Sequence, residues 1–190
     1  MYKRQVTDLA RLVAKDAPHQ GLVLECAPLE DIHLDEAITA NDGPLVILDQ
    51  VTDPHNVGAI LRSAAAFEAA ALVTQDRHAP PESGVLAKSA SGALETVPWV
   101  RVVNLARAMD EMAEAGYWRI GLDGEAETDL ASALPAGRVA LVLGAEGEGM
   151  RQNIASHCDA HARLPIGNAI ESLNVSNAAA IALYAVATRG

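Results

Sequence analysis

The chain has 190 residues, of which 50% are hydrophobic and 21% are charged, and its formal net charge is −11. This length fits a single domain with a substantial core, and the apolar content excludes disorder for the bulk of the chain. No apolar run reaches the roughly 18 residues that a membrane-spanning helix needs. Charges at Asp8, Arg11, Lys15 and Asp16 exclude a signal peptide. We therefore expect a soluble, cytoplasmic protein with no membrane partner.

The rarer residue types exclude further classes. Cys26 and Cys158 form no C-x-x-C motif and the six histidines are scattered, so the sequence predicts no metal site. Both cysteines are expected to be small buried apolar residues. Aromatic residues make up 3% of the chain, which excludes the stacking surface of common single-strand RNA readers. The acidic balance excludes a broad, non-specific nucleic-acid surface, so any RNA contact is expected to be local.

In chain order, the hydrophobic pattern predicts strands that alternate with helices. The apolar run 44–50 is typical of a strand covered on both faces, whereas 104–115 has the period of an amphipathic helix that Asn104 caps. The expected strands are 21–26, 44–50, 70–74, 97–103, 117–122, 138–143 and 162–166. The expected helices are 5–15, a turn within 28–38, 58–67, 104–115, 149–158 and 173–188. This alternation predicts one α/β domain whose mainly parallel sheet is covered by helices on both faces.

The loop at 53–62, D-P-H-N-V-G-A-I-L-R, is the first candidate for a site, because ligands of open α/β sheets bind at the carboxyl ends of strands. Asn56 is expected to cap the next helix, and Gly58 to admit another backbone at close range. Arg62 is expected on the same helix face as Gly58. The same residues also fit an ordinary helix start with a solvated arginine.

The loop at 141–150, L-V-L-G-A-E-G-E-G-M, runs from a buried strand into three glycines. It matches neither the dinucleotide fingerprint nor the phosphate-binding P-loop. Glu146 and Glu148 would repel a phosphate, so the expected ligand is neutral or cationic where it touches the loop and is held by backbone groups. A flexible turn is the alternative. A side chain at Gly144 is expected to abolish binding while leaving the protein folded.

The third candidate, 164–183, is the start of an Ala-rich helix. Its polar side chains are Glu171, Ser172, Asn174, Ser176 and Asn177. Ser172 or Asn174 would serve as an ordinary cap, but the polar groups exceed what one cap needs. No Ser-His-Asp or Cys-His arrangement stands out, and His55 is the histidine that lies in a candidate loop.

Taken in order, these three stretches resemble the three motifs of the SpoU (TrmH) family of RNA ribose 2′-O-methyltransferases. The matching segments are 56–62, 141–151 and 164–176. The stretch S-G-A-L-E-T-V-P at 91–98, with N-L-A-R-A-M after it, resembles the bacterial branch of this family that methylates the 2′-oxygen of a guanosine in 23S rRNA. The resemblance runs from about His19 to the C-terminus. Asn177 departs from it, since an apolar residue is expected there.

The resemblance implies a SPOUT-type α/β knot, in which the C-terminal segment forms a trefoil knot. It also implies S-adenosylmethionine as cofactor, RNA as substrate, no metal, and a homodimer with a shared active site. Catalytic and substrate-orienting roles fall on Asn56, Arg62, Glu146, Ser172 and Asn174. Contacts to the cofactor fall on Leu143, Gly144, Glu146, Ile166 and Leu173.

Enzymes of this branch usually carry an N-terminal RNA-binding domain. Residues 1–20 are instead interpreted as a linker-like extension, and 21–190 as the SPOUT-type catalytic domain. We therefore expect either a fragment or a chain that relies on a partner for RNA recruitment. The small residues at 178–187 and the helix after Asn56 are expected to form the dimer contact.

The resemblance assigns Arg62 the role of base, assisted by an RNA phosphate. Because a guanidinium has a pKa above about 12, we instead expect Arg62 to hold the phosphate and stabilise the developing alkoxide. Glu146 would orient Arg62, and Asn56 the ribose. The alternatives are a tRNA guanosine 2′-O-methyltransferase and a non-catalytic RNA-binding or dimerisation module. An oxidoreductase is disfavoured, because no strand is followed by G-x-G-x-x-G.

Overall fold

The computed structural model describes residues 6–13, 21, 23, 25, 27, 29–30, 32–167 and 169–189. Within them, parallel strands form one sheet in the order β3-β2-β1-β5-β4-β6. The strands are β1 (Leu45–Leu48), β2 (Ala71–Gln75), β3 (Trp99–Val102), β4 (Trp118–Leu122), β5 (Val139–Leu143) and β6 (Ala160–Ala162). The helices are α1 (Val6–Leu9), α2 (Leu34–Ala40), α3 (Pro54–Ala66), α4 (Gly84–Ala90), α5 (Leu105–Glu114), α6 (Leu130–Ala133), α7 (Gln152–Ala155) and α8 (Val175–Thr188), with 3₁₀ turns η1 (Asp76–His78) and η2 (Ala93–Glu95).

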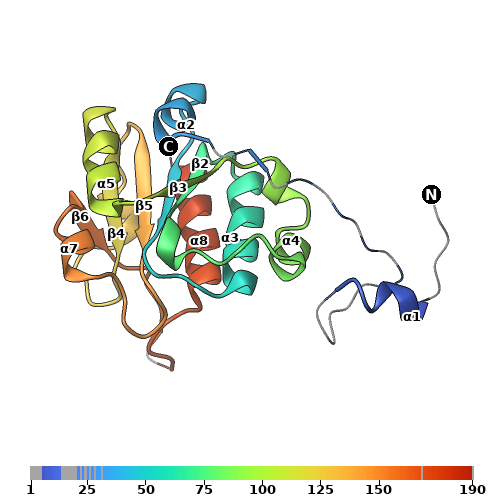
Figure 1. Cartoon of the computed structure of the whole chain (residues 1–190). Helices are drawn as coiled ribbons and strands as arrows, with labels where there is room; N and C mark the ends of the chain where they lie inside the picture. The colour runs from blue at the N-terminus through green and yellow to red at the C-terminus, as the bar shows by residue number, and fades with distance from the viewer. Residues whose placement is uncertain are drawn as a thin grey trace.

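Helices cover both faces of this sheet, with α3, α4 and α8 on one side and α5 and α7 on the other (Figure 1). Successive side chains of a strand point to opposite faces, so β1 contributes Val46 and Leu48 to one core and Leu45 and Ile47 to the other. β1 and β5 are the central strands and are buried along their whole length. This burial is the physical reason for their uninterrupted apolar sequences.

The structure confirms the α/β class, the parallel sheet and its helical cover. Five of the expected strands appear as β1 to β5. The expected strand 162–166 was wrong in position, since β6 lies at Ala160–Ala162 and pairs with residues 120–122 of β4. Pro165 explains this, because proline has no N–H for a sheet ladder. The trefoil knot that the resemblance implies stays a prediction.

Two helix boundaries differ from the expected ones. The helix expected at 149–158 shortens to α7, because Gly149 has a φ of 70° and Arg151 has extended backbone, so both belong to the preceding loop. The helix expected at 58–67 begins earlier, at Pro54, and its cap is Asp53, whose Oδ1 accepts the N–H of His55 at 2.9 Å. Asn56 as the helix cap was therefore wrong, whereas the Asn104 cap of α5 is confirmed.

The N-terminal predictions fall mostly outside the described residues. Of the helix expected at 5–15, α1 covers 6–9, and residues 5, 14 and 15 lie outside. Of the strand expected at 21–26, residues 21, 23 and 25 are described and belong to no strand, and the rest, with Cys26, lies outside. Cys158 packs against the core on the α5 side, and burial raises the pKa of its thiol to about 12. None of the helices in the described ranges has the length and hydropathy of a membrane span.

Candidate functional site

A cavity of about 1030 Å³ opens at the carboxyl ends of β4, β5 and β6. This is the edge of a parallel sheet at which ligands bind. The segments that follow the three strands form its walls, together with the start of α8. The residues to which the resemblance assigns cofactor contacts all line this cavity: Leu143, Gly144, Glu146, Ile166 and Leu173. Ser172, one of the expected catalytic residues, lines it as well. The structure thus brings two distant sequence motifs to one cavity.

The loop 144–150, which we call the glycine loop, folds back on itself directly after β5. The N–H of Ala145 donates to the Gly149 carbonyl at 3.1 Å, and the Gly149 N–H returns to the Ala145 carbonyl at 2.9 Å. Gly147 and Gly149 take φ values of 82° and 70°, which disfavour any other residue. A Cβ added at Gly144 would lie 2.0 Å from the Gly149 carbonyl carbon. The flexible turn that the sequence left open is therefore not what forms, and a side chain at Gly144 conflicts with the fold itself.

Glu146 is the meeting point of three segments. Its Oε1 accepts the amide of Asn174 at 2.6 Å, the amide of Asn56 at 3.2 Å and the backbone N–H of Val175 at 3.3 Å. The Asn174 amide also donates to Asn56 Oδ1 at 3.0 Å, while Asn174 Oδ1 accepts the N–H of Ser176 and so caps α8. Three of the five side chains expected to be catalytic thus form one cluster, which joins α3, the glycine loop and α8.

Arg62 stands apart from this cluster. It is exposed on α3, six residues beyond Asn56, and its guanidinium has no hydrogen-bond or ion-pair partner among the described residues. The expected orientation of Arg62 by Glu146 is not present among the described residues, where Glu146 instead accepts hydrogen bonds from the amides of Asn56 and Asn174. Gly58, one turn before Arg62, does admit a close neighbour: its Cβ would lie 2.5 Å from Ser89 Cβ and 2.6 Å from the Leu86 carbonyl oxygen of α4.

Asp49 and Arg151 are residues of the site region that the sequence reasoning missed. Asp49 directly follows β1 and is fully buried, and its carboxylate accepts three hydrogen bonds from Arg151 at 2.6 to 2.8 Å. A signal was available, since an aspartate at the end of an apolar strand has to be paired when it is buried. Arg151 lies at the end of the second motif, in which the sequence pattern indicated a role only for the glycines and glutamates.

Acidic side chains dominate the cavity. Its carboxylates are Asp123, Glu125, Asp129, Glu146, Glu148 and Glu171. Arg163 also lines the cavity, but its guanidinium pairs with Asp129 at 2.9 Å. This charge disfavours an anionic ligand and agrees with the neutral or cationic ligand that the sequence predicts. No cluster of three or more His, Cys, Asp or Glu within the described ranges is arranged to hold a metal ion.

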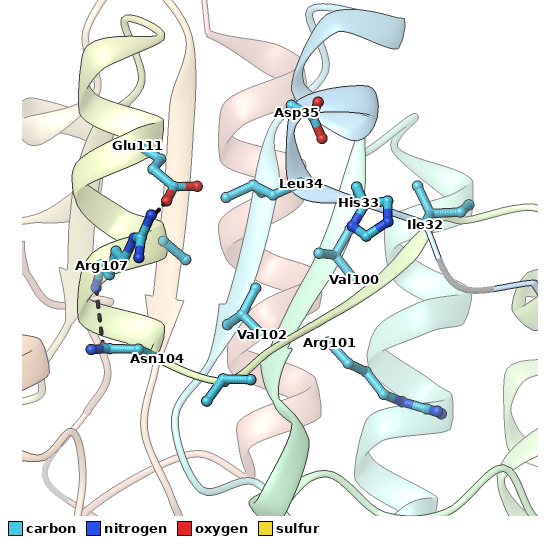
Figure 2. Close-up of a pocket in the computed structure, with 12 residues that line it drawn as sticks. Ile32, His33, Leu34, Asp35, Val100, Arg101, Val102, Asn104, Arg107 and Glu111 are labelled. Atoms are coloured by element: carbon cyan, nitrogen blue, oxygen red, sulfur yellow. Dashed lines mark hydrogen bonds and ion pairs between the residues drawn. The ribbon is translucent and has the colours of Figure 1, made fainter.

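A second, smaller cavity of about 470 Å³ lies between α2, the edge strand β3 and α5, and contains none of the expected site residues (Figure 2). Its polar side chains serve the local structure. Arg107 pairs with Glu111 at 3.1 Å, and Asn104 caps α5. The larger cavity therefore remains the candidate site.

Comparison with known proteins agrees with this assignment. The model of the SpoU rRNA Methylase family matches residues 43–184. The chain is 43% identical over 175 residues to the 23S rRNA (guanosine-2′-O-)-methyltransferase RlmB of Vibrio vulnificus, covering 90% of this chain and 71% of that protein. It is 44% identical over 177 residues to RlmB of Ralstonia nicotianae, covering 92% and 71%.

Solved structures give the same picture. The SpoU methyltransferase AviRb from Streptomyces viridochromogenes, in complex with the cofactor AdoMet, superposes with a TM-score of 0.76 at 28% identity. The superposition covers 84% of this chain and 65% of AviRb.

Proposed function

The chain belongs to the SpoU rRNA methylase family, and we propose that it transfers the methyl group of S-adenosylmethionine to a ribose 2′-hydroxyl of RNA. The proposed target is a guanosine of 23S rRNA, as the names of the RlmB relatives state for those proteins. The observation that carries the proposal is the Glu146 cluster, which places Asn56 and Asn174 beside the large acidic cavity.

The cavity fits the proposed cofactor in size, charge and backbone access. Its volume of about 1030 Å³ is at the upper end of small-molecule sites, which span about 300–1,000 Å³. Its carboxylates suit a ligand that carries a sulfonium and an ammonium group. We propose that backbone groups of 143–147 and 164–173 hold it, without a metal. When bound, S-adenosylmethionine supplies an electrophilic methyl group on positively charged sulfur.

Three side chains of the protein are proposed to orient the RNA and to stabilise its negative charge. Alignment of the hydroxyl with the methyl group contributes about 7 kcal/mol or more in favourable cases. Asn56 and Asn174 are suited to this task, because their hydrogen bonds to Glu146 fix both amides. Arg62 is suited to bind the adjacent phosphate, since its guanidinium has no partner among the described residues and can donate to two phosphate oxygens at once. It would also stabilise the negative charge that develops on the 2′-oxygen while the hydroxyl proton passes to solvent.

Arg62 lies apart from the Glu146 cluster within one chain. In a homodimer, Arg62 of one protomer would act beside the Glu146 cluster of its partner, which would complete the site. The exposed face of α8 and α3 supports this assembly. Ile181 and Tyr184 on α8 are 46% and 58% exposed, and the Tyr184 ring packs edge-on against Phe67 at 6.1 Å. Apolar side chains gathered at a surface mark an interface.

Replacing both exposed α8 residues, in Ile181→Glu/Tyr184→Glu, is expected to convert the dimer into a monomer, because two charges would be buried at the contact. Sedimentation at micromolar concentration measures this. Val103→Glu is the control, since Val103 is 83% exposed and lines the smaller cavity beside α2 and α5, helices of the sheet face that α3 and α8 do not cover. A wild-type monomer would contradict the proposed dimer.

Methyl transfer tests the activity directly. The purified chain is incubated with S-adenosylmethionine labelled in its methyl group and with unmodified 23S rRNA or unmodified tRNA. Label on a guanosine 2′-oxygen of 23S rRNA is the expected result. Label on tRNA alone would favour the tRNA alternative. Cofactor binding without transfer to either RNA would favour the non-catalytic module, and absence of cofactor binding would refute the proposal.

A further inference from the structure

Asp49 holds both ends of the glycine loop. Its backbone N–H donates to the carbonyl of Leu143, the last residue before the loop, at 2.8 Å. Its side-chain Oδ2 accepts the backbone N–H of Arg151, the first residue after the loop, also at 2.8 Å. A single buried residue therefore sets the distance between the points at which the chain enters and leaves the loop.

The Arg151 side chain completes this clamp. Its Nε and Nη2 donate to Asp49 Oδ1 at 2.8 and 2.6 Å, and Nη2 also donates to Gln75 Oε1 at 2.9 Å. Gln75 in turn donates to the Val103 carbonyl at 3.1 Å. The base of the loop is thus tied to the carboxyl ends of β1, β2 and β3.

Neither residue of the clamp lines the large cavity, whereas every residue from Gly144 to Met150 does. Asp49 is fully buried, so a bound molecule cannot touch its carboxylate. Any influence on ligand binding has to pass through the shape of the glycine loop. That shape also decides where Glu146 stands, and with it the amides of Asn56 and Asn174.

We propose that Asp49 and Arg151 are positioning residues that preorganise the glycine loop for S-adenosylmethionine. The inference rests on the proposed function, because it takes that molecule as the occupant of the cavity. The buried carboxylate and the guanidinium are a charged pair whose strength depends on both partners. Loss of either partner leaves the other uncompensated and lets the ends of the loop separate.

The chain contains a matched control for this clamp. Asp159 accepts the backbone N–H of Arg119 at 2.8 Å and its guanidinium at 2.7 and 2.9 Å, with the same set of donors. This second pair lies at the amino ends of β4 and β6 and lines neither cavity. A purely structural role would give both pairs the same consequences on substitution.

The experiment compares Asp49→Asn and Arg151→Lys with Asp159→Asn and Arg119→Lys. Binding of S-adenosylmethionine is measured by titration calorimetry without RNA, and melting temperature is measured on the same samples. Asp49→Asn should weaken binding by about tenfold or more, since a small misplacement of a binding element has effects of this size or larger. The amino-edge variants should change binding by less than about twofold, as expected for distant sites, although they also lower the melting temperature.

Arg151→Lys keeps the positive charge but loses the two-pronged guanidinium. Its affinity for S-adenosylmethionine should therefore lie between those of the wild type and Asp49→Asn, and it replaces Asp49→Asn in the test if that variant does not fold. In methyl transfer, the carboxyl-edge variants should raise KM for the cofactor and also lower kcat, because the shape of the glycine loop places Glu146 and the two amides bonded to it. Wild-type affinity in Arg151→Lys, or equal losses of affinity in both pairs, would overturn the inference. Failure of the wild type to bind S-adenosylmethionine would instead refute the proposed function.

Discussion

Two arginine–aspartate pairs with the same donors lie at opposite edges of one parallel sheet. At the carboxyl edge, Asp49 is 0% and Arg151 38% exposed, and at the amino edge Asp159 is 22% and Arg119 12% exposed. Each aspartate accepts a backbone N–H and two guanidinium N–H groups of its arginine. The hydrogen-bond donors are therefore the same, and the two pairs differ in the burial of their side chains and in their position in the sheet.

The difference lies in what each pair holds. The Arg119 guanidinium also donates to the Met109 carbonyl at 3.3 Å, so the amino-edge pair ties β4 and β6 to α5. These are elements that pack against one another in any case. The carboxyl-edge pair instead joins the two ends of the glycine loop, whose residues line the large cavity. An ion pair affects function when the segment that it restrains belongs to the site.

The largest effect is expected from adding a side chain to the glycine loop at the carboxyl edge of the sheet. Gly144→Ala would place Cβ 2.0 Å from the Gly149 carbonyl carbon and 2.2 Å from the Met150 nitrogen, both of them backbone atoms. We expect no measurable binding of S-adenosylmethionine and a free energy of unfolding lowered by about 3 kcal/mol, as for an overpacked core. Calorimetry and urea denaturation measure the two quantities.

Gly124→Ala is the control for this substitution, because Gly124 lines the same cavity and a Cβ there meets no atom within 4 Å. It should bind the cofactor like the wild type. Cofactor binding by Gly144→Ala at wild-type strength would show that the glycine loop is not part of the cofactor site.

Arg62, which has no carboxylate partner in the part of the chain that the structure describes, gives the next largest expected effect. Arg62→Ala should lower the rate of methyl transfer by about 100-fold or more, the effect of removing one group that stabilises developing negative charge. Arg62→Lys keeps the charge but loses the fork, and should lose most of the activity. Cofactor affinity should stay unchanged in both, since Arg62 does not line the cavity.

Labelled methyl transfer and calorimetry separate these effects. Arg107→Ala is the control, because it also removes an exposed arginine but one that pairs with Glu111 on α5. Normal transfer by Arg62→Ala would mean that Arg62 is an ordinary solvated helix residue. Lost cofactor binding would mean that it shapes the pocket instead.

The smallest effect is expected at the amino edge, as a pH-dependent loss of stability. Hydrogen bonds from the Arg119 guanidinium hold the pKa of Asp159 below its usual value, against an opposing effect of burial. The unfolded aspartate has a pKa of about 3.9, so the pair stabilises fully above about pH 5 and loses this contribution as the pH falls through the folded pKa.

Arg119→Gln should therefore lower the free energy of unfolding by about 2 kcal/mol at pH 7, the contribution of a hydrogen-bonded charged group. The difference from wild type should shrink when urea denaturation is repeated at successively lower pH, below about pH 4. A difference that stays constant with pH would mean that Arg119 acts through packing alone.

Much of the fold follows from local patterns. The apolar runs of β1 and β5, the Asn104 cap and the helix period of α5 depend on neighbouring residues, so they could be predicted. The order of the three motifs sufficed for the family, which the comparisons confirm. The helix cap at Asn56 could not be predicted correctly, because Asp53 is an equally good cap three residues earlier and the sequence does not rank the two.

The amino-acid sequence by itself determined strands β1 to β5, most of the helices and, through the resemblance, the five residues with expected cofactor contacts that line the cavity. Only the tertiary structure decided which of these residues meet. Asn56 contacts a glutamate 90 positions away and an asparagine 118 positions away, and Asp49 pairs with an arginine 102 positions away. Such contacts depend on β1 lying beside β5 and α3 beside α8, an order of elements that no local pattern encodes. Among the described residues, the same order left Arg62 without a hydrogen-bond or ion-pair partner, and neither α3 nor α4 contains a carboxylate.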